Sequence, residues 1–284
     1  MASDDPLAEI TQLALSGTEP QRRQLAAHRD SPPELLMLLA SDASPPVRQA
    51  VANNTAAPAH ADRLLCQDSL ASIRASLARK LGAQAGELMR EDLPRRLRLA
   101  RDALLLLAQD VETSVRAALA DTLADLPDAP RELVLALARD AVLAVCEPLI
   151  RLSAALREED LLELVASPPH HHTRPAIARR LHVTSPVAEA LLQIGDEAAI
   201  VALLRNTTAR LVPAALAWLV EQAAMLPWLQ EPLAAHPHLP EAAHARLVGS
   251  LGREALARLA LHGGVPRAVA PSPRPALVWG AAPA

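Results

Sequence analysis

One run of residues in the sequence has the chemistry to bind a metal: the adjacent histidines His170–His172, which His182 follows. Imidazole is a common zinc ligand, but a zinc site needs several ligands at spacings that bring them together. Adjacent histidines do not point to one side of a helix, and no Cys or carboxylate lies at a ligand spacing around them. The stretch SPPHHHTRP is more typical of a turn that leads into a helix. We therefore expect no dedicated metal site and no cofactor, and adventitious metal binding stays open.

A second cluster, Glu158–Asp160, has the carboxylates that general acid–base catalysis uses. Its context, LREEDLLELV, is more typical of the first turn of a helix, where the macrodipole favours acids. The sequence has no Gly-rich phosphate loop, no HExxH and no serine elbow. A helical-repeat DNA glycosylase needs aromatic rings around an extruded base, and the sequence has no Phe or Tyr. We expect no enzyme activity and assign no catalytic residues.

The segment 74–101 has a local excess of positive charge that suits an anionic partner. Only Glu87, Glu91 and Asp92 offset it. The excess is open to three interpretations: a solvated helical face, a surface for a partner protein, or a grip on a nucleic-acid backbone. The segment has no aromatic residues for base stacking, which makes nucleic acid the less favoured partner. The candidate partner-binding residues are Arg79, Lys80, Arg90, Arg95, Arg96, Arg98 and Arg101.

Helices must position these residues, because a core of Leu and Ala with almost no rings favours close helix packing over a sheet. The segment from Pro33 to Pro58 predicts one unit: a leucine-striped helix that ends at Ser41-Asp42, then a second helix that begins near Pro45-Pro46 and ends at Asn53-Asn54. The unit recurs with variable length. About seven to nine such antiparallel pairs predict an all-α protein, a right-handed α-solenoid.

A fixed spacing marks three of these units, in which an aspartate is followed five and six residues later by an aliphatic residue and an arginine. The aspartate can accept backbone N–H bonds of the next helix while the arginine clamps it, so we expect Arg116 to be the partner of Asp110. The alternative is a row of arginines that awaits an acidic partner. After Asp140, Cys146 replaces the arginine, so we expect the pattern only in the first half. The structural ladder residues are Asp42, Arg48, Asp68, Arg74, Asp110 and Arg116.

This spacing resembles the HEAT-repeat pattern, with Val47, Ile73 and Val115 at the aliphatic position. The block from Leu133 to Leu211, with ARDAVLAVCEPLIRL and HHTRPAIARRLHVTSPVAEALLQIGDEAAIVALLRNTTARL, resembles the bacterial family called domain of unknown function 2336. The likeness covers about the first 215 residues. It implies a helical-repeat fold in which the Asp and Arg side chains bridge the turns of neighbouring repeats. It implies no activity and no catalytic residues.

The composition places further bounds on the protein. A formal net charge of −4 over 284 residues argues against a surface built entirely for polyanions. Cys66 and Cys146 stand far apart with no CxxC, so we expect two reduced, buried thiols. The acidic start MASDDPLAEI is unlike a signal peptide and no apolar run is long enough to span a bilayer, so we expect a cytoplasmic protein without a membrane partner.

The end of the chain changes in character. Gly263-Gly264 closes the last helical pattern, and PSPRPALVWGAAPA is Pro-rich. We therefore expect one helical-repeat domain, 1–265, and a tail, 266–284, whose Trp279 is either free or docked on the last helix pair. The function expected is a non-enzymatic scaffold or adaptor that binds another protein, with nucleic-acid binding through 74–101 as the alternative. The partner, the pathway and the oligomeric state are not determined by these patterns.

Overall fold

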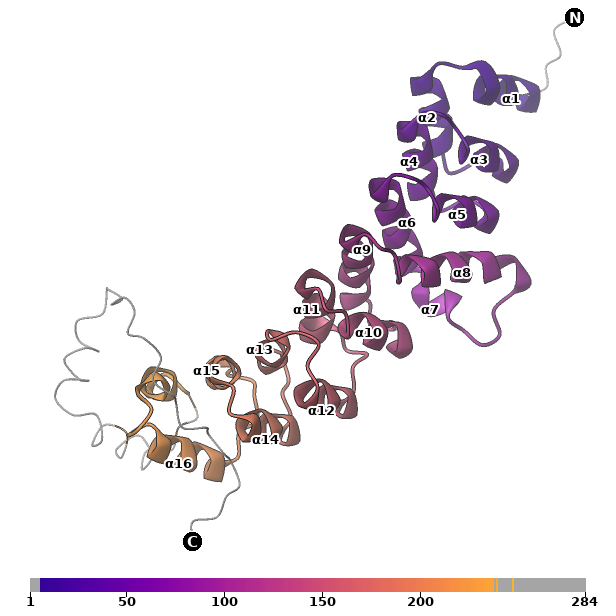
Figure 1. The fold of residues 1–284 in the computed structure, drawn as a ribbon. Coiled ribbons are helices and arrows are strands. Elements are labelled where there is room, and N and C mark those ends of the chain that lie inside the picture. The colour runs from indigo at the N-terminus through magenta and orange to yellow at the C-terminus, as the bar shows by residue number, and fades with distance from the viewer. Residues whose placement is uncertain (1–5, 238, 240–246, 248–284) are drawn as a thin grey trace, which may run out of the picture. The chain divides into compact units, whose positions relative to one another are not determined.

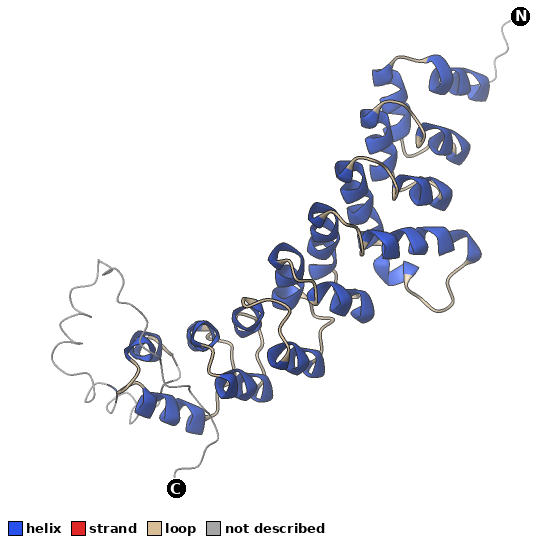
Figure 2. Ribbon diagram, viewed as in Figure 1, coloured by secondary structure: helices blue, strands red, loops and turns tan. Residues whose placement is uncertain are grey.

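A computed structural model describes residues 6–237, 239 and 247 of the chain. These residues form helices and connecting loops, and none of them lies in a strand (Figure 2). The all-α expectation is therefore confirmed for the described part. The chain divides into two compact units, Met1–Leu156 and Arg157–Ala284.

Helices of the first unit pack in two rows (Figure 1). In the first row α2, α4, α6, α9 and α11 pack in succession; in the second row α1, α3, α5 and α8 do so, and α10 covers α9 and α11. The helices are α1 (Pro6–Ser16), α2 (Glu19–Ala27), α3 (Pro33–Leu39), α4 (Pro45–Asn53), α5 (Ala59–Leu65), α6 (Ala71–Ala83), α7 (Ala85–Leu88), the 3₁₀ turn η1 (Arg95–Leu97), α8 (Arg98–Leu107), α9 (Thr113–Ala124), α10 (Arg131–Ala138) and α11 (Leu143–Leu152).

The described part of the second unit also consists of paired helices. α12 packs on α13 and α14, α13 packs on α15, and α17 packs on α15 and α16. The helices are α12 (Glu158–Ala166), α13 (Thr173–Ala178), α14 (Ser185–Ile194), α15 (Glu197–Arg205), α16 (Pro213–Gln222), the 3₁₀ turn η2 (Pro227–Leu229) and α17 (Gln230–Ala234).

Local sequence explains where these helices begin and end. The predicted unit from Pro33 to Pro58 is confirmed in its two helices: α3 begins at Pro33, and α4 begins at Pro45 and ends at Asn53, whereas α3 ends at Leu39, before the expected Ser41-Asp42. Proline suits a first helical position because its missing N–H would have no intrahelical partner there. Gly195 ends α14 with a φ of 74°, in the left-handed region that only glycine adopts freely.

Small residues and leucines fill the core. Leu77, Leu119 and Leu123 of α6 and α9 are fully buried. Gly82 lets these two helices approach closely, because a Cβ at this position would lie 2.9 Å from Leu119 Cδ1. Both cysteines are buried and form no disulfide, as expected.

Two sequence-based expectations fall beyond this part of the chain. The domain end at 265 and the tail 266–284, with Trp279, lie outside the described residues. Of the helices that the structure does describe, none combines the length and apolar character needed to cross a membrane.

Candidate functional site

Four arginines of the first row each grip an aspartate in the turn of the following helix pair. The guanidinium Nε and Nη2 donate to the two carboxylate oxygens, and the Nη2 distances are 3.0–3.3 Å. This two-point contact matches the planar fork of arginine to the carboxylate. The Nε–Oδ2 distances are 2.7 Å for Arg22–Asp42 and 2.6 Å for Arg48–Asp68, Arg74–Asp110 and Arg116–Asp140. We call these eight residues the Arg–Asp ladder.

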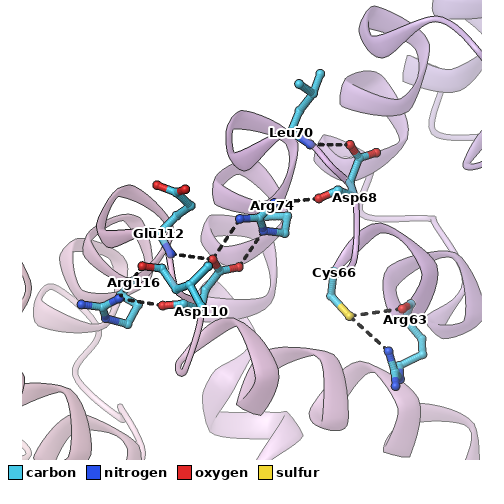
Figure 3. Close-up of polar contacts among 9 residues, drawn as sticks. Arg63, Cys66, Asp68, Leu70, Arg74, Asp110, Glu112 and Arg116 are labelled. Carbon is cyan, nitrogen blue, oxygen red and sulfur yellow. Dashed lines mark hydrogen bonds and ion pairs between the residues drawn. The ribbon is translucent and has the colours of Figure 1, made fainter.

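Each of these arginines also donates a hydrogen bond to a backbone oxygen of its own helix pair. Arg74 Nη1 donates to the backbone oxygen of Asp68 at 2.7 Å, six residues earlier, while its other nitrogens reach Asp110 (Figure 3). The aspartates are used twice as well: Asp68 Oδ1 accepts the backbone N–H of Leu70 at 2.9 Å. Every Arg–Asp pair, or rung, of the ladder therefore joins two consecutive turns, and its aspartate accepts a backbone N–H at the start of the next helix of the first row.

The structure corrects the partner expected for Asp110. Its carboxylate is held by Arg74, and Arg116 donates to the carboxylate of Asp140 instead. Arg116 touches Asp110 only at the backbone oxygen, at 2.6 Å. The carboxylate of Asp110 accepts the N–H of Glu112 and faces the previous unit, so its own arginine must reach forward to the next turn.

Burial and the contacts with arginine act in opposite directions on the pKa values of the ladder aspartates. The arginine side chains are 12–21% exposed and the aspartates 4–13%. Burial alone would raise the pKa of Asp68, Asp110 and Asp140, but hydrogen bonds from the arginine and the backbone hold each pKa below its ordinary value. The hydrogen bond from Arg22 is the main cause of the lowered pKa of Asp42. These groups serve internal contacts and offer little surface to a partner.

The first and last members of the ladder are those that the spacing did not identify. Arg22 has Ser16 six residues before it in place of an aspartate, and it bonds to the backbone oxygen of Gly17 at 2.7 Å. Asp140 was recognised only as the start of a unit without an arginine. At that arginine position Cys146 is fully buried, and burial raises the pKa of its thiol to about 11.

Lys80 is not a surface residue, which corrects its place among the candidate partner-binding residues. Its side chain is 5% exposed, and its Nζ lies 2.5 Å from Asp62 Oδ1, itself in a side chain 6% exposed. The ammonium also donates to the backbone oxygen of Asn54 at 3.3 Å. Burial raises the pKa of Asp62, and Lys80 opposes this by favouring the carboxylate. Counting local charge missed this pair because the acid lies 18 residues away.

The other basic residues of the segment remain at the surface. Arg79 is exposed on α6 and its Nη2 lies 3.2 Å from Ser76 Oγ. Arg90 pairs with Asp92 at 3.0 Å, both well exposed. Arg95, Arg96 and Arg98 are exposed at η1 and the start of α8, and Arg101 is half-buried on α8.

Two asparagines form a second kind of link that sequence reasoning did not single out. Asn54 Nδ2 donates to the backbone oxygens of Ala26 and His28, and Asn206 Nδ2 donates to those of Ala178 and Arg180. The separations along the chain are the same, 28 and 26 residues. Each side-chain oxygen accepts the N–H two residues on. The repeated letters NTAA and NTTA, at 54–57 and 206–209, are the signal that could have found them.

The two clusters with possible chemistry are turns and helix starts, as expected. The rings of His170, His171 and His172 lie against one another in the turn before α13, with centroids 4.1–5.3 Å apart. His170 Nδ1 accepts the N–H of His172 at 3.1 Å. Within the part of the chain that the structure describes, no group of three His, Cys, Asp or Glu residues could hold a metal ion. Glu158–Asp160 form the first turn of α12.

Comparison with known proteins supports the resemblance to one family. The model of DUF2336, described as an uncharacterised protein conserved in bacteria, matches residues 145–272. The matched region is 128 of the 284 residues, so it is less than half of the chain. It begins after the last ladder residue and runs past 215, so it differs at both ends from the extent expected from the sequence. No curated protein matches the chain, and no solved structure does.

Proposed function

We propose that the protein is a non-enzymatic scaffold that binds a partner protein along a surface of its stacked helix pairs. In this proposal the pairs are HEAT-like repeats, and each unit is a stretch of a right-handed α-solenoid. The successive packing within each row and the Asp-to-Arg spacing support it. The Arg–Asp ladder stiffens the turns, and rigid extended surfaces suit long partners.

The observation that carries the proposal is the set of exposed arginines around η1. Arg95, Arg96 and Arg98 are exposed, whereas the ladder arginines and Lys80 are committed to internal ion pairs. Exposed charge does little for the stability of a fold. Its concentration here favours electrostatic attraction of an acidic surface on a partner protein.

Affinity capture from the native cell, read by mass spectrometry, tests the proposal. The bait is the full chain, compared with a variant in which Arg95, Arg96 and Arg98 are all changed to Glu. A partner that binds the native chain should be lost from this variant and retained by Arg29→Glu, a charge reversal at an exposed arginine in the loop after α2. A partner captured equally by both variants would refute the role of the η1 arginines.

The same arginines support a second candidate, a grip on the phosphates of a nucleic acid. Binding of labelled DNA and RNA at stepwise salt concentrations separates the two functions, because phosphate contacts make affinity strongly salt-dependent. We expect weak or no binding near physiological salt. A submicromolar dissociation constant that the triple reversal abolishes would favour nucleic acid over protein.

A further inference from the structure

The two units have a groove at the same place in their architecture. One lies between α2 and α4, with a volume of about 640 Å³, and the other, which we call the α13–α15 groove, lies between α15 and the turn that follows α13, with a volume of about 430 Å³. At the edge of each stands the asparagine that ties one helix of the pair to the end of the other, Asn54 or Asn206. Both volumes fall in the range of sites that hold a ligand or a short peptide segment, about 300–1,000 Å³.

The lining of both grooves is basic and contains no carboxylate among the described residues. The α2–α4 groove has Arg23, which is exposed, and the α13–α15 groove has Arg179 and Arg205, also exposed. The chain as a whole has more acidic than basic residues, 32 against 28, whereas the charged side chains that line these grooves are arginines.

Arg205 shows what such an arginine binds. Its Nη2 lies 3.2 and 3.0 Å from the two carboxylate oxygens of Glu231, and both side chains are largely exposed. A carboxylate from the same chain thus binds one arginine of this groove, and Arg179 is the second arginine of the lining.

The remaining lining suits a peptide backbone. Gln24 of α2 and Gln49 and Asn53 of α4 place amide groups on the two helices of the first groove. An amide both donates and accepts hydrogen bonds, as a peptide bond does. Small residues, Ala27 and Ala50, line the space between these amides, so a main chain can approach closely.

We propose that each groove binds an extended, acidic peptide segment, with Arg23 or Arg179 gripping a glutamate or aspartate side chain and the polar groups of the lining contacting the main chain. In the second groove Leu181, 70% exposed, offers an apolar contact to the same segment. A nucleic acid fits less well, because affinity for it rests on several phosphate contacts and on aromatic stacking, and the lining of each groove has few arginines and no aromatic residue. The proposal shares with the proposed function only the class of partner; its residues are different.

Fluorescence anisotropy of labelled peptides tests this inference on the full chain. The probes are short peptides in which glutamate alternates with alanine or leucine, the same peptides with glutamine for glutamate, and single-stranded oligo-dT. The variants are Arg23→Glu, Arg179→Glu and the double variant. The control is Arg29→Glu, a reversal at an exposed arginine that lines neither groove and does not belong to the η1 set. Circular dichroism verifies that every variant is folded.

We expect the acidic peptides to bind, each single variant to remove one binding site, and the double variant to weaken binding at least about tenfold, as for a lost charge-assisted contact. The glutamine peptides should bind more weakly than the acidic ones, and Arg29→Glu should have no effect. Three outcomes would overturn the inference: no binding of the acidic peptides, equal weakening by Arg29→Glu, or oligo-dT binding that depends on Arg23 and Arg179. Failure of the η1 triple reversal to release a captured partner would refute the proposed function and leave these titrations unchanged.

Discussion

Replacing Arg74 by alanine removes the third rung of the Arg–Asp ladder and tests what the ladder contributes to stability. The change deletes two hydrogen bonds to the carboxylate of Asp110, at 2.6 and 3.0 Å, and one to the backbone oxygen of Asp68, at 2.7 Å. Asp110, 8% exposed, then keeps the N–H of Glu112 as its hydrogen-bond donor, at 2.9 Å. A largely buried carboxylate is left without its cation.

The expected cost follows from this geometry. A hydrogen bond to a charged group contributes about 1.5–3 kcal/mol net, and breaking a buried ion pair from one side costs about 3–5 kcal/mol. Because Arg74 is 12% exposed, water can replace part of the lost contact, so we expect a loss of about 2–4 kcal/mol in the free energy of unfolding. That is a large fraction of the roughly 5–15 kcal/mol that stabilises a folded protein.

Urea unfolding followed by circular dichroism measures this loss. Arg98→Ala is the matched control, since Arg98 is exposed, and its free energy of unfolding should stay within about 0.5 kcal/mol of the native value. A double-mutant cycle with Asp110→Ala should give a coupling energy of about 1–3 kcal/mol. If Arg74→Ala is as stable as Arg98→Ala, or the coupling energy is zero, the ladder is not a source of stability and the reasoning is wrong.

Three further predictions concern other buried contacts. Lys80→Met should cost about 3–5 kcal/mol in the free energy of unfolding, because it leaves the carboxylate of Asp62 buried without a cation. Measured by urea unfolding, this cost should shrink as the pH falls toward 4, because a protonated Asp62 needs no cation. An equal cost at all pH values would contradict this. Asn54→Ala should lower the free energy of unfolding by about 2 kcal/mol, because two hydrogen bonds to backbone oxygens are lost. The control Asn53→Ala, at an exposed neighbour, should cost almost nothing. Equal losses for the two variants in thermal melts would contradict the role of Asn54. The pKa values of the ladder aspartates lie below the ordinary value of about 3.9. Their contribution to the free energy of unfolding should therefore be complete above that pH and be lost as the pH falls through the lowered values. A free energy of unfolding that is unchanged between about pH 5 and 3 would contradict this.

The sequence identified the members of the ladder more readily than their partners. The interval from aspartate to arginine within a unit is short and constant, so it is visible in one sequence. The interval from an arginine to the aspartate that it grips varies between 20 and 36 residues, because the helices and loops between them vary in length. Arg22 was missed for the same reason: its grip on Asp42 depends on the next unit, and its own unit lacks the aspartate.

Burial explains the other difference between sequence and structure. Lys80 and Arg79 are neighbours in the sequence and were grouped by charge, yet one is buried on Asp62 and the other is exposed. Which side of α6 faces α5 depends on packing between helices, and a count of charges contains no information on it. The helix boundaries of α3 and α4 were predictable because proline and asparagine act locally.

The spacing of the third rung separates what holds the protein together from what can change. Arg74 and Asp110 are 36 residues apart, against 20–24 in the other rungs, yet their Nε–Oδ2 distance is the same 2.6 Å. The added length is an excursion through α7 and η1, and it contains Arg90, Arg95 and Arg96. The rung forms across this excursion, so its exposed residues can change without disturbing the rungs on either side, whereas Ala85, Leu88 and Leu93 are buried and belong to the core. Under the proposed function, changes at the exposed Arg90, Arg95 and Arg96 alone would exchange one partner for another on the same framework.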